Sequence, residues 1–313
     1  MSTLKKPILA LAPLHEITDA AFRETIAACG APDLMYTEFT SVDGLSHEVG
    51  RERIIRRYLQ RGENETNTRA QFFGTDPEKF ANAARITREL GFAGMDINMG
   101  CPDKAVVKNG AGGALINDPK RAVEIVAASI EGAGGLPVSV KTRLGHTTDV
   151  ADTWIPTLLD TGIDILTLHA RTVKEMSKVP AKWNRIKDFA PLAQEKGILL
   201  IGNGDVQSRE DARAHIIEAA CDGAMIGRAI FGNFWFFNPD IRTEDLPLAE
   251  KLNALSDLAE RFETRYGEFR SISTLRKHVK GLVHGFPGSS EIREELMACT
   301  TAAAFRAVAS RYA

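Results

Sequence analysis

Short apolar segments alternate along the chain with longer stretches in which apolar residues recur every three or four positions. Several of the short segments are almost continuously apolar, as strands buried on both faces are. Eight strand–helix units favour a closed parallel (β/α)8 barrel, the TIM barrel of the α/β class, over an open sheet. The eight expected strands are Ile8–Leu14, Leu34–Phe39, Arg69–Gly74, Gly94–Gly100, Val138–Gly145, Ile165–Arg171, Leu199–Asp205 and Gly223–Arg228.

Capping residues mark the ends of several expected helices. Asp76–Pro77 opens a helix that Gly91 closes, and Asp118–Pro119 opens another. Thr18 or Asp19 is expected to cap the first helix.

The strand pattern stops after the eighth expected strand. From about Leu248 the chain is helical in texture, and one face of the first helix is apolar; that face carries Leu252, Leu255, Leu258, Ala259 and Phe262. We therefore expect a barrel domain over residues 1–243 and a smaller all-helical domain over residues 244–313.

Composition narrows the class of protein without fixing it. The longest apolar runs are too short to span a bilayer, and the first residues lack a complete secretory signal. The four cysteines show neither a CxxC pair nor metal-ligand spacing, so we expect no metal and a reducing, cytoplasmic compartment. The net charge of −2 means that a nucleic-acid partner would need local basic patches.

Polar residues gather at the carboxyl ends of the expected strands, where barrel enzymes carry their active sites. The third strand begins with Arg69 and carries Gln71. The ends of the next strands supply Asn98 and Cys101, then Lys141 and Arg143, His169 and Arg171, Asn203, Gly204 and Asp205, and finally Gly227 and Arg228.

The last two strand ends predict a phosphate site. Gly204 and Gly227 let backbone amides approach an anion closely, and Arg228 adds positive charge. No GxGxxG joins a strand to a helix, so a Rossmann dinucleotide pocket is unsupported. Flavin mononucleotide (FMN), which has one phosphate, suits the site, and Gln71 is then placed to hydrogen-bond the flavin ring.

Lys141 and Cys101 each have more than one chemical interpretation. Lys141 is expected to stabilise negative charge on a reduced flavin, with a Schiff-base lysine or a buried ion pair as alternatives. Cys101 lies on a loop at the barrel mouth and can serve as a nucleophile or a proton donor. We interpret the other three cysteines, Cys29, Cys221 and Cys299, as small hydrophobic residues.

His169 and Arg171 are separated by one residue on the sixth expected strand, and we expect them in different layers of the barrel. His169 is expected to face the flavin, and Arg171 to lie nearer the substrate.

Three basic runs are compatible with a polyanionic partner as well as with ordinary solvated faces. They comprise Arg51, Arg53, Arg56, Arg57 and Arg61; Lys174, Lys178, Lys182, Arg185 and Lys187; and Arg270, Arg276, Lys277, His278 and Lys280.

The ordered set of motifs resembles the tRNA-dihydrouridine synthase family over nearly the whole chain. The matching segments are Asn98-Met99-Gly100-Cys101-Pro102 with Lys104 and Gly110-Ala111-Gly112, Val138 to Gly145, Leu168 to Thr172, Asn203-Gly204-Asp205, Met225 to Arg228, Arg276-Lys277-His278 and Pro287-Gly288.

This resemblance implies an FMN-bound barrel and a helical tRNA-recognition domain in a monomer that uses NADPH as reductant. It implies that Cys101 is the catalytic acid and that Asn98, Arg143 and Arg171 lie near the target uracil. The implied flavin positions are Pro13, Leu14, Gln71, Lys141, His169, Asn203, Gly204, Asp205, Gly227 and Arg228.

The chain departs from the family pattern at Leu14-His15-Glu16 and at Ala170. Two other functions stay open: an FMN barrel that oxidises or reduces a free pyrimidine, and a noncatalytic RNA-binding barrel.

Overall fold

The protein was analysed as a computed structural model, which describes residues 4–62 and 65–312. Its parallel sheet is ordered β1-β9-β8-β7-β6-β5-β4-β2, and β3 also pairs with β4. A bridge between Ala10 and Leu34 joins the two ends of the sheet, so the strands form a nearly closed barrel. The TIM-barrel prediction is confirmed. The strands are β1 Ile8–Leu11, β2 Met35–Tyr36, β3 Thr40–Ser41, β4 Thr68–Phe73, β5 Gly94–Met99, β6 Val138–Gly145, β7 Ile165–Thr172, β8 Leu199–Asn203 and β9 Gly223–Ile226.

The second predicted strand is the one that differs most from the prediction. Instead of one strand over 34–39, the chain forms the two-residue strands β2 and β3. Between them, Thr37 accepts the amide N–H of Gln71 through its hydroxyl (3.0 Å), and Glu38 accepts the amide N–H of Glu16 (2.5 Å). These side-chain hydrogen bonds replace the regular strand pairing at this point.

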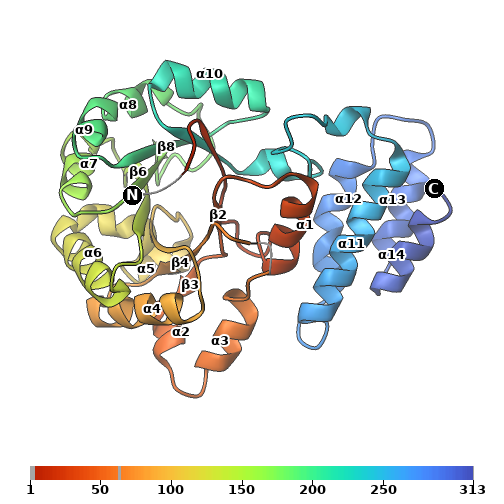
Figure 1. The fold of residues 1–313 in the computed structure, drawn as a ribbon, viewed down its shortest axis with the longest axis horizontal. Coiled ribbons are helices and arrows are strands. Elements are labelled where there is room, and N and C mark those ends of the chain that lie inside the picture. Colours follow the sequence, from red (N-terminus) through yellow and green to blue (C-terminus); the bar gives the residue numbers. More distant parts are fainter. Residues whose placement is uncertain (1–3, 63–64, 313) are drawn as a thin grey trace.

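In the described part of the chain, ten α-helices surround the barrel (Figure 1). The predicted caps are confirmed: Asp19, Asp76 and Asp118 each accept an amide N–H from the first turn of the following helix. The helices are α1 Ala20–Gly30, α2 Val42–Ser46, α3 Arg51–Tyr58, α4 Pro77–Glu89, α5 Lys104–Lys108, α6 Pro119–Ala133, α7 Ala151–Leu159, α8 Trp183–Lys187, α9 Ala190–Glu195 and α10 Arg209–Ala219. Short 3-10 turns cover Gly112–Asn117, Arg228–Ile230, Thr243–Asp245 and Ile272–Leu275.

The C-terminal part of the described chain is helical, as expected. Figure 1 shows its helices grouped to one side of the barrel, with α1 between them and the strands. The apolar face predicted on its first helix is fully buried. The domain boundary at residue 243 stays a prediction. The helices are α11 Leu248–Tyr266, α12 Arg276–Leu282, α13 Ser289–Ala298 and α14 Ala302–Ala309.

The barrel interior is divided between apolar and polar side chains. A small apolar cluster inside the barrel includes Ile8, Tyr36, Ile201 and Met225, and a larger core lies between the strands and the helices. The inward positions of β4, β5 and β6 instead carry buried polar residues, such as Asp96. This polar side lies below the site described next. Within the residues that the structure describes, no helix is long and apolar enough to cross a membrane.

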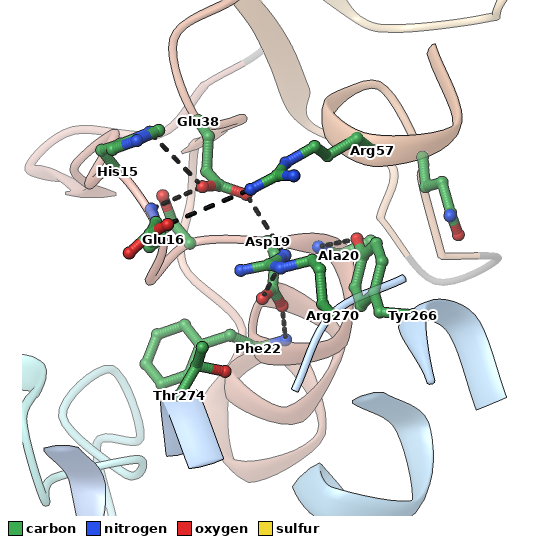
Figure 2. Close-up of polar contacts among 12 residues, drawn as sticks. His15, Glu16, Asp19, Ala20, Phe22, Glu38, Arg57, Tyr266, Arg270 and Thr274 are labelled. Atoms are coloured by element: carbon green, nitrogen blue, oxygen red, sulfur yellow. Dashed lines mark hydrogen bonds and ion pairs between the residues drawn. The ribbon is translucent and has the colours of Figure 1, made fainter. Parts of the chain in front are cut away.

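The turn between β1 and α1 is held by the C-terminal helical part (Figure 2). Arg270 donates to the carboxylate of Asp19 at 3.1 Å, and both side chains are buried. The hydroxyl of Tyr266 accepts the amide N–H of Ala20 at 3.1 Å. The Lys277 ammonium donates to the backbone carbonyl of Glu16. Residues from both parts of the chain therefore fix this turn.

Candidate active site

A cavity of about 610 Å³ opens at the carboxyl ends of the barrel strands. This is the size of a typical small-molecule site. All the predicted site residues except Gln71 line it. They are Pro13, Leu14, Asn98, Cys101, Lys141, Arg143, His169, Arg171, Asn203, Gly204, Asp205, Gly227 and Arg228.

Gln71 is the one predicted site residue that lies below the cavity and outside its lining. Its side chain is fully buried. The Nε2 atom donates to Asp96 at 2.6 Å, and Oε1 accepts from Nδ2 of Asn98 at 3.0 Å. Each end of the amide makes one hydrogen bond with a protein group and keeps one further N–H or lone pair, so the flavin contact of Gln71 stays a prediction.

Backbone near two glycines forms one wall of the cavity. Gly204 has φ +128°, and a Cβ there would lie 2.7 Å from Cβ of Ala181, so a larger residue does not fit. At Gly227 a Cβ would meet no atom within 4 Å, and it would occupy open cavity space instead. The exposed Arg228 lies next in the chain. We call Gly204, Asp205, Gly227 and Arg228 the phosphate cradle; all four line the cavity, and their role in phosphate binding stays a prediction.

Asp205 orders Arg228 of this cradle and the neighbouring Arg171. Its carboxylate accepts from Arg171 at 2.5 Å, from Arg228 at 3.1 Å and from the amide N–H of Ala181 at 2.8 Å. Burial alone would raise the pKa of Asp205, but the hydrogen bonds from Arg171 and Ala181 lower it overall. Asp205 is consequently ionised at neutral pH, and it keeps positive charge on the cavity wall.

His169 and Arg171 both reach the cavity and contact each other. Nε2 of His169 lies 3.1 Å from Nη1 of Arg171. Burial, reinforced by the charges of Arg143 and Lys141, holds the pKa of His169 well below its usual value. The imidazole is therefore neutral, and because Arg171 can only donate, Nε2 accepts and the proton is on Nδ1.

Lys141 is a partly buried cation in the lining of the cavity. Its Nζ donates to Oδ1 of Asn203 at 3.3 Å, and Nδ2 of Asn203 donates to the carbonyl of Met225 at 2.8 Å. Burial, together with the charge of Arg143, lowers the pKa of Lys141 to about 8. The ammonium is still mainly protonated at pH 7. Within the described part of the chain no carboxylate accepts a hydrogen bond from Nζ, which argues against the buried ion pair considered above.

Cys101 lies at the rim of the cavity on the loop after β5. Its amide N–H and that of Gly100 both donate to Oδ1 of Asn98, at 2.9 and 3.1 Å. The guanidinium of Arg143 donates to the Gly100 carbonyl at 2.8 Å, which holds the same loop from the other side. Burial raises the pKa of the Cys101 thiol. A thiol that stays protonated at neutral pH is better suited to donate a proton than to act as a nucleophile.

The guanidinium of Arg143 is fixed by hydrogen bonds to backbone carbonyls. Its Nη1 donates to Thr172 and Met176, at 3.1 and 3.0 Å. Burial, with the nearby charge of Arg171, lowers its pKa to about 10. Arg143 therefore stays cationic at neutral pH and contributes positive charge to the cavity lining.

Two residues of this region were missed in the sequence analysis. Phe39 lines the cavity from the segment before β3, and Asp96 lies buried beneath the floor. A carboxylate within an otherwise apolar strand was the available signal for Asp96.

The predicted basic runs are partly neutralised. Arg185 contacts Asp149, Asp152 and Asp188, and Lys182 pairs with Glu175. The three arginine–carboxylate contacts make Arg185 a structural residue, so the second run offers less charge to a partner than its sequence indicates. On α3, Arg56 pairs with Glu268.

Fold and cavity together define a (β/α)8-barrel protein with a basic, thiol-bearing site in the position of a barrel active site. The model of the dihydrouridine synthase family matches residues 10–311. The chain therefore belongs to the dihydrouridine synthase family. It is 38% identical over 300 residues to a probable tRNA-dihydrouridine synthase of Staphylococcus epidermidis, a match that covers 95% of this chain and 90% of the relative. It is also 38% identical over 298 residues to probable tRNA-dihydrouridine synthase 2 of Bacillus subtilis, covering 94% and 90%.

Solved structures agree with the fold at low sequence identity. Histamine dehydrogenase from Rhizobium sp. 4-9 superposes with a TM-score of 0.56 at 13% identity, covering 81% of this chain and 48% of that one. Morphinone reductase in complex with tetrahydroNAD gives a TM-score of 0.51 at 13% identity, covering 75% and 86%. These likenesses support the barrel fold alone.

Proposed function

We propose that the protein is a tRNA-dihydrouridine synthase that reduces the C5–C6 double bond of specific uridines in tRNA. The observation that carries the proposal is the position of Cys101 in the lining of the same cavity as Lys141, Gly204, Gly227 and Arg228. Family membership and the names of the relatives from S. epidermidis and B. subtilis support the same activity.

The cavity residues fit FMN. Gly227 leaves space that a side chain would fill, and Arg228 and the backbone at Gly204 would hold the phosphate. Lys141, with Asn203 and neutral His169 beside it, would lie along the flavin ring and stabilise its negative charge. Pro13 and Leu14 would form the opposite wall. When bound, FMN supplies the hydride, and NADPH is the reductant.

The substrate uracil would lie between the flavin site and the Cys101 loop. Asn98 lines the cavity beside this loop, and the charges of Arg143 and Arg171 favour the electron-rich carbonyl oxygens of the base. Because Arg143 commits Nε and Nη1 to backbone carbonyls, it acts on the base through its field and its remaining nitrogen.

The proton comes from Cys101. Hydride addition at C6 of the uracil leaves an enolate, and an acid must then protonate C5. Burial keeps the thiol protonated until that moment, and the loop hydrogen bonds to Asn98 hold it at the cavity rim. Lys141 and Arg143 carry positive charge nearby, so the thiolate left behind is stabilised.

The tRNA and its surroundings complete the proposal. The target uridine must leave its stack to enter the cavity, so the enzyme must also grip the surrounding RNA. The barrel of residues 1–243 would carry the chemistry, and residues 244–313 would help to recognise the tRNA. We propose a cytoplasmic monomer.

Visible absorption of the purified protein tests the proposal first. Flavin bands that bleach on addition of NADPH, followed by reduction of tRNA that lacks dihydrouridine, are the expected results. A colourless protein that cannot be reconstituted with FMN would contradict the flavin assignment. Turnover of a free pyrimidine without tRNA would instead indicate the other oxidoreductase considered in the sequence analysis.

A further inference from the structure

Three polar residues form a hydrogen-bonded layer inside the barrel, below the cavity floor. Gln71, Asp96 and Ser139 lie side by side in the registers of β4, β5 and β6. All three are fully buried. The carboxylate of Asp96 accepts from Nε2 of Gln71 at 2.6 Å and from the hydroxyl of Ser139 at 2.5 Å. The mechanism above gives no role to Asp96 or Ser139, and a flavin contact is the role predicted for Gln71.

The layer continues upward to the loop that carries the thiol. Oε1 of Gln71 accepts from Nδ2 of Asn98 at 3.0 Å. Oδ1 of Asn98 then accepts the amide N–H groups of Gly100 and Cys101, at 3.1 and 2.9 Å. An unbroken chain of hydrogen bonds therefore leads from Asp96 to the backbone of Cys101.

The charge of Asp96 determines which atoms of Gln71 and Asn98 donate hydrogen bonds and which accept them. Burial raises the pKa of Asp96 to about 6, although the hydrogen bonds from Ser139 and Gln71 oppose the rise. At neutral pH the carboxylate is mainly ionised and can only accept hydrogen bonds. Gln71 must turn its NH2 group toward Asp96, which leaves its oxygen for Asn98. Asn98 must then turn its oxygen toward the two loop amides.

We propose that Asp96 is a positioning residue that, through Gln71 and Asn98, fixes the loop carrying the Cys101 thiol. The reversed chain would direct the NH2 group of Asn98 at two N–H donors, and buried donors left without an acceptor are costly. The expected effect on kcat rests on the proposed function, whereas the expected effect on the position and accessibility of the Cys101 loop does not.

Exchanging the carboxylate and the amide between positions 96 and 71 tests the proposal. Gln71→Met keeps the size of the side chain and cuts the chain of hydrogen bonds. The double variant Gln71→Glu with Asp96→Asn restores it. The amide introduced at position 96 would accept from Ser139 and donate to the carboxylate introduced at position 71, whose second oxygen would accept from Asn98. The double variant also keeps the charge of the layer unchanged.

The first readout is the alkylation rate of Cys101 by iodoacetamide in flavin-free protein at pH 8, followed on the Cys101 peptide by mass spectrometry. We expect Gln71→Met to raise the rate at least about fivefold, because a loosened loop exposes a thiol that is now partly buried. The double variant should return to within about twofold of wild type. Ser129→Ala, which removes a buried hydroxyl on α6 outside the barrel, is the matched control and should leave the rate unchanged.

The second readout separates positioning from binding. In tRNA reduction at saturating FMN, with rates normalised to bound flavin, Gln71→Met should lower kcat about tenfold with little change in the KM for tRNA, and the double variant should recover kcat.

Two results would overturn the proposal: a Gln71→Met rate within twofold of wild type, or a double variant as reactive as Gln71→Met. If Gln71 and Asp96 only filled space, the double variant should raise the alkylation rate more than Gln71→Met alone. If Gln71→Met does not fold, the double variant alone decides, since a wild-type alkylation rate supports the chain and a raised rate refutes it. A wild-type protein that reduces no tRNA would refute the proposed function, and the alkylation pattern would still test the chain.

Discussion

Glu38 should make the protein less stable as the pH rises from about 4.5 to about 7. Its side chain is 1% exposed. Oε1 accepts the amide N–H of Glu16. Oε2 has no hydrogen-bond partner within the described residues, and its nearest cation is Arg270 at 3.8 Å (Figure 2). Burial, with the negative charge of Asp19, raises the pKa of Glu38 to about 7, even though Arg270 opposes the rise.

The size of the effect follows from this shift. The pKa of Glu38 rises from its ordinary 4.5 to about 7 on folding. Between these values the folded protein binds more protons than the unfolded chain, so the free energy of unfolding falls as the pH increases. At about 1.4 kcal/mol per pH unit, the full loss is about 3 kcal/mol. It is complete above pH 7, where Glu38 is ionised in both states.

Glu38→Gln should remove this loss because glutamine keeps the shape and the acceptor oxygen but cannot ionise. We expect the variant to gain stability relative to wild type between pH 4.5 and 7.5, by about 3 kcal/mol in total. Urea denaturation of flavin-free protein at half-unit steps of pH measures the difference. The same comparison in a His15→Ala background excludes the neighbouring imidazole, whose Nδ1 lies 3.8 Å from Glu38 Oε1. A difference that does not change with pH would refute the reasoning.

Three further substitutions test separate parts of the structure. Cys101→Ala should retain the flavin absorbance and lower turnover by about 10²–10⁴, as measured by dihydrouridine formation, since it removes the acid; full activity would exclude the thiol as proton donor. Gly227→Val should weaken FMN binding at least about tenfold in a fluorescence titration, because a Cβ there meets no atom within 4 Å and the side chain would occupy open cavity space. Arg270→Met should lower the free energy of unfolding by about 3–5 kcal/mol, because Asp19 and Glu38 lose their shared buried cation, and unchanged urea denaturation would contradict this.

The sequence predicted the barrel and most of the cavity because both depend on simple periodicity. Buried parallel strands are apolar over their length, and in a barrel all their carboxyl ends face the same side. Lys141, His169 and Asn203 therefore lie together although they are far apart in the chain. They occupy the neighbouring strands β6, β7 and β8, in registers that align Lys141 with Thr167 and His169 with Asn203.

Other features depend on contacts that no local pattern carries. The break between β2 and β3 arises because Thr37 bonds to Gln71 of another strand, which the apolar run over residues 34–39 cannot reveal. The same holds for the basic runs, since the three carboxylates around Arg185 come from before α7, from α7 and from after α8.

Gln71 shows that a strand pattern predicts which way a side chain points but not its height in the barrel. Alternation indicates that Gln71 and Asn98 both point into the barrel, but it does not give the height of one strand against the next. In the structure Gln71 pairs in register with Asp96, which places it one layer below Asn98 and out of the cavity. At this level of the barrel the cavity lining is supplied by Asn98 and the loop beyond it, and the predicted flavin contact of Gln71 stays a prediction.

The wall of the cavity also depends on residues that the sequence assigned to another domain. Pro13 and Leu14 line the cavity immediately before the turn whose far side is tied to Tyr266, Arg270 and Lys277. Arg270 is itself packed on the rings of Phe262 and Tyr266, at 5.1 and 4.9 Å from their centroids, so its position is set by α11. The helical part thus supports the cavity as well as extending the surface around it. A contact made there with a partner would act on the same turn that borders the proposed flavin site.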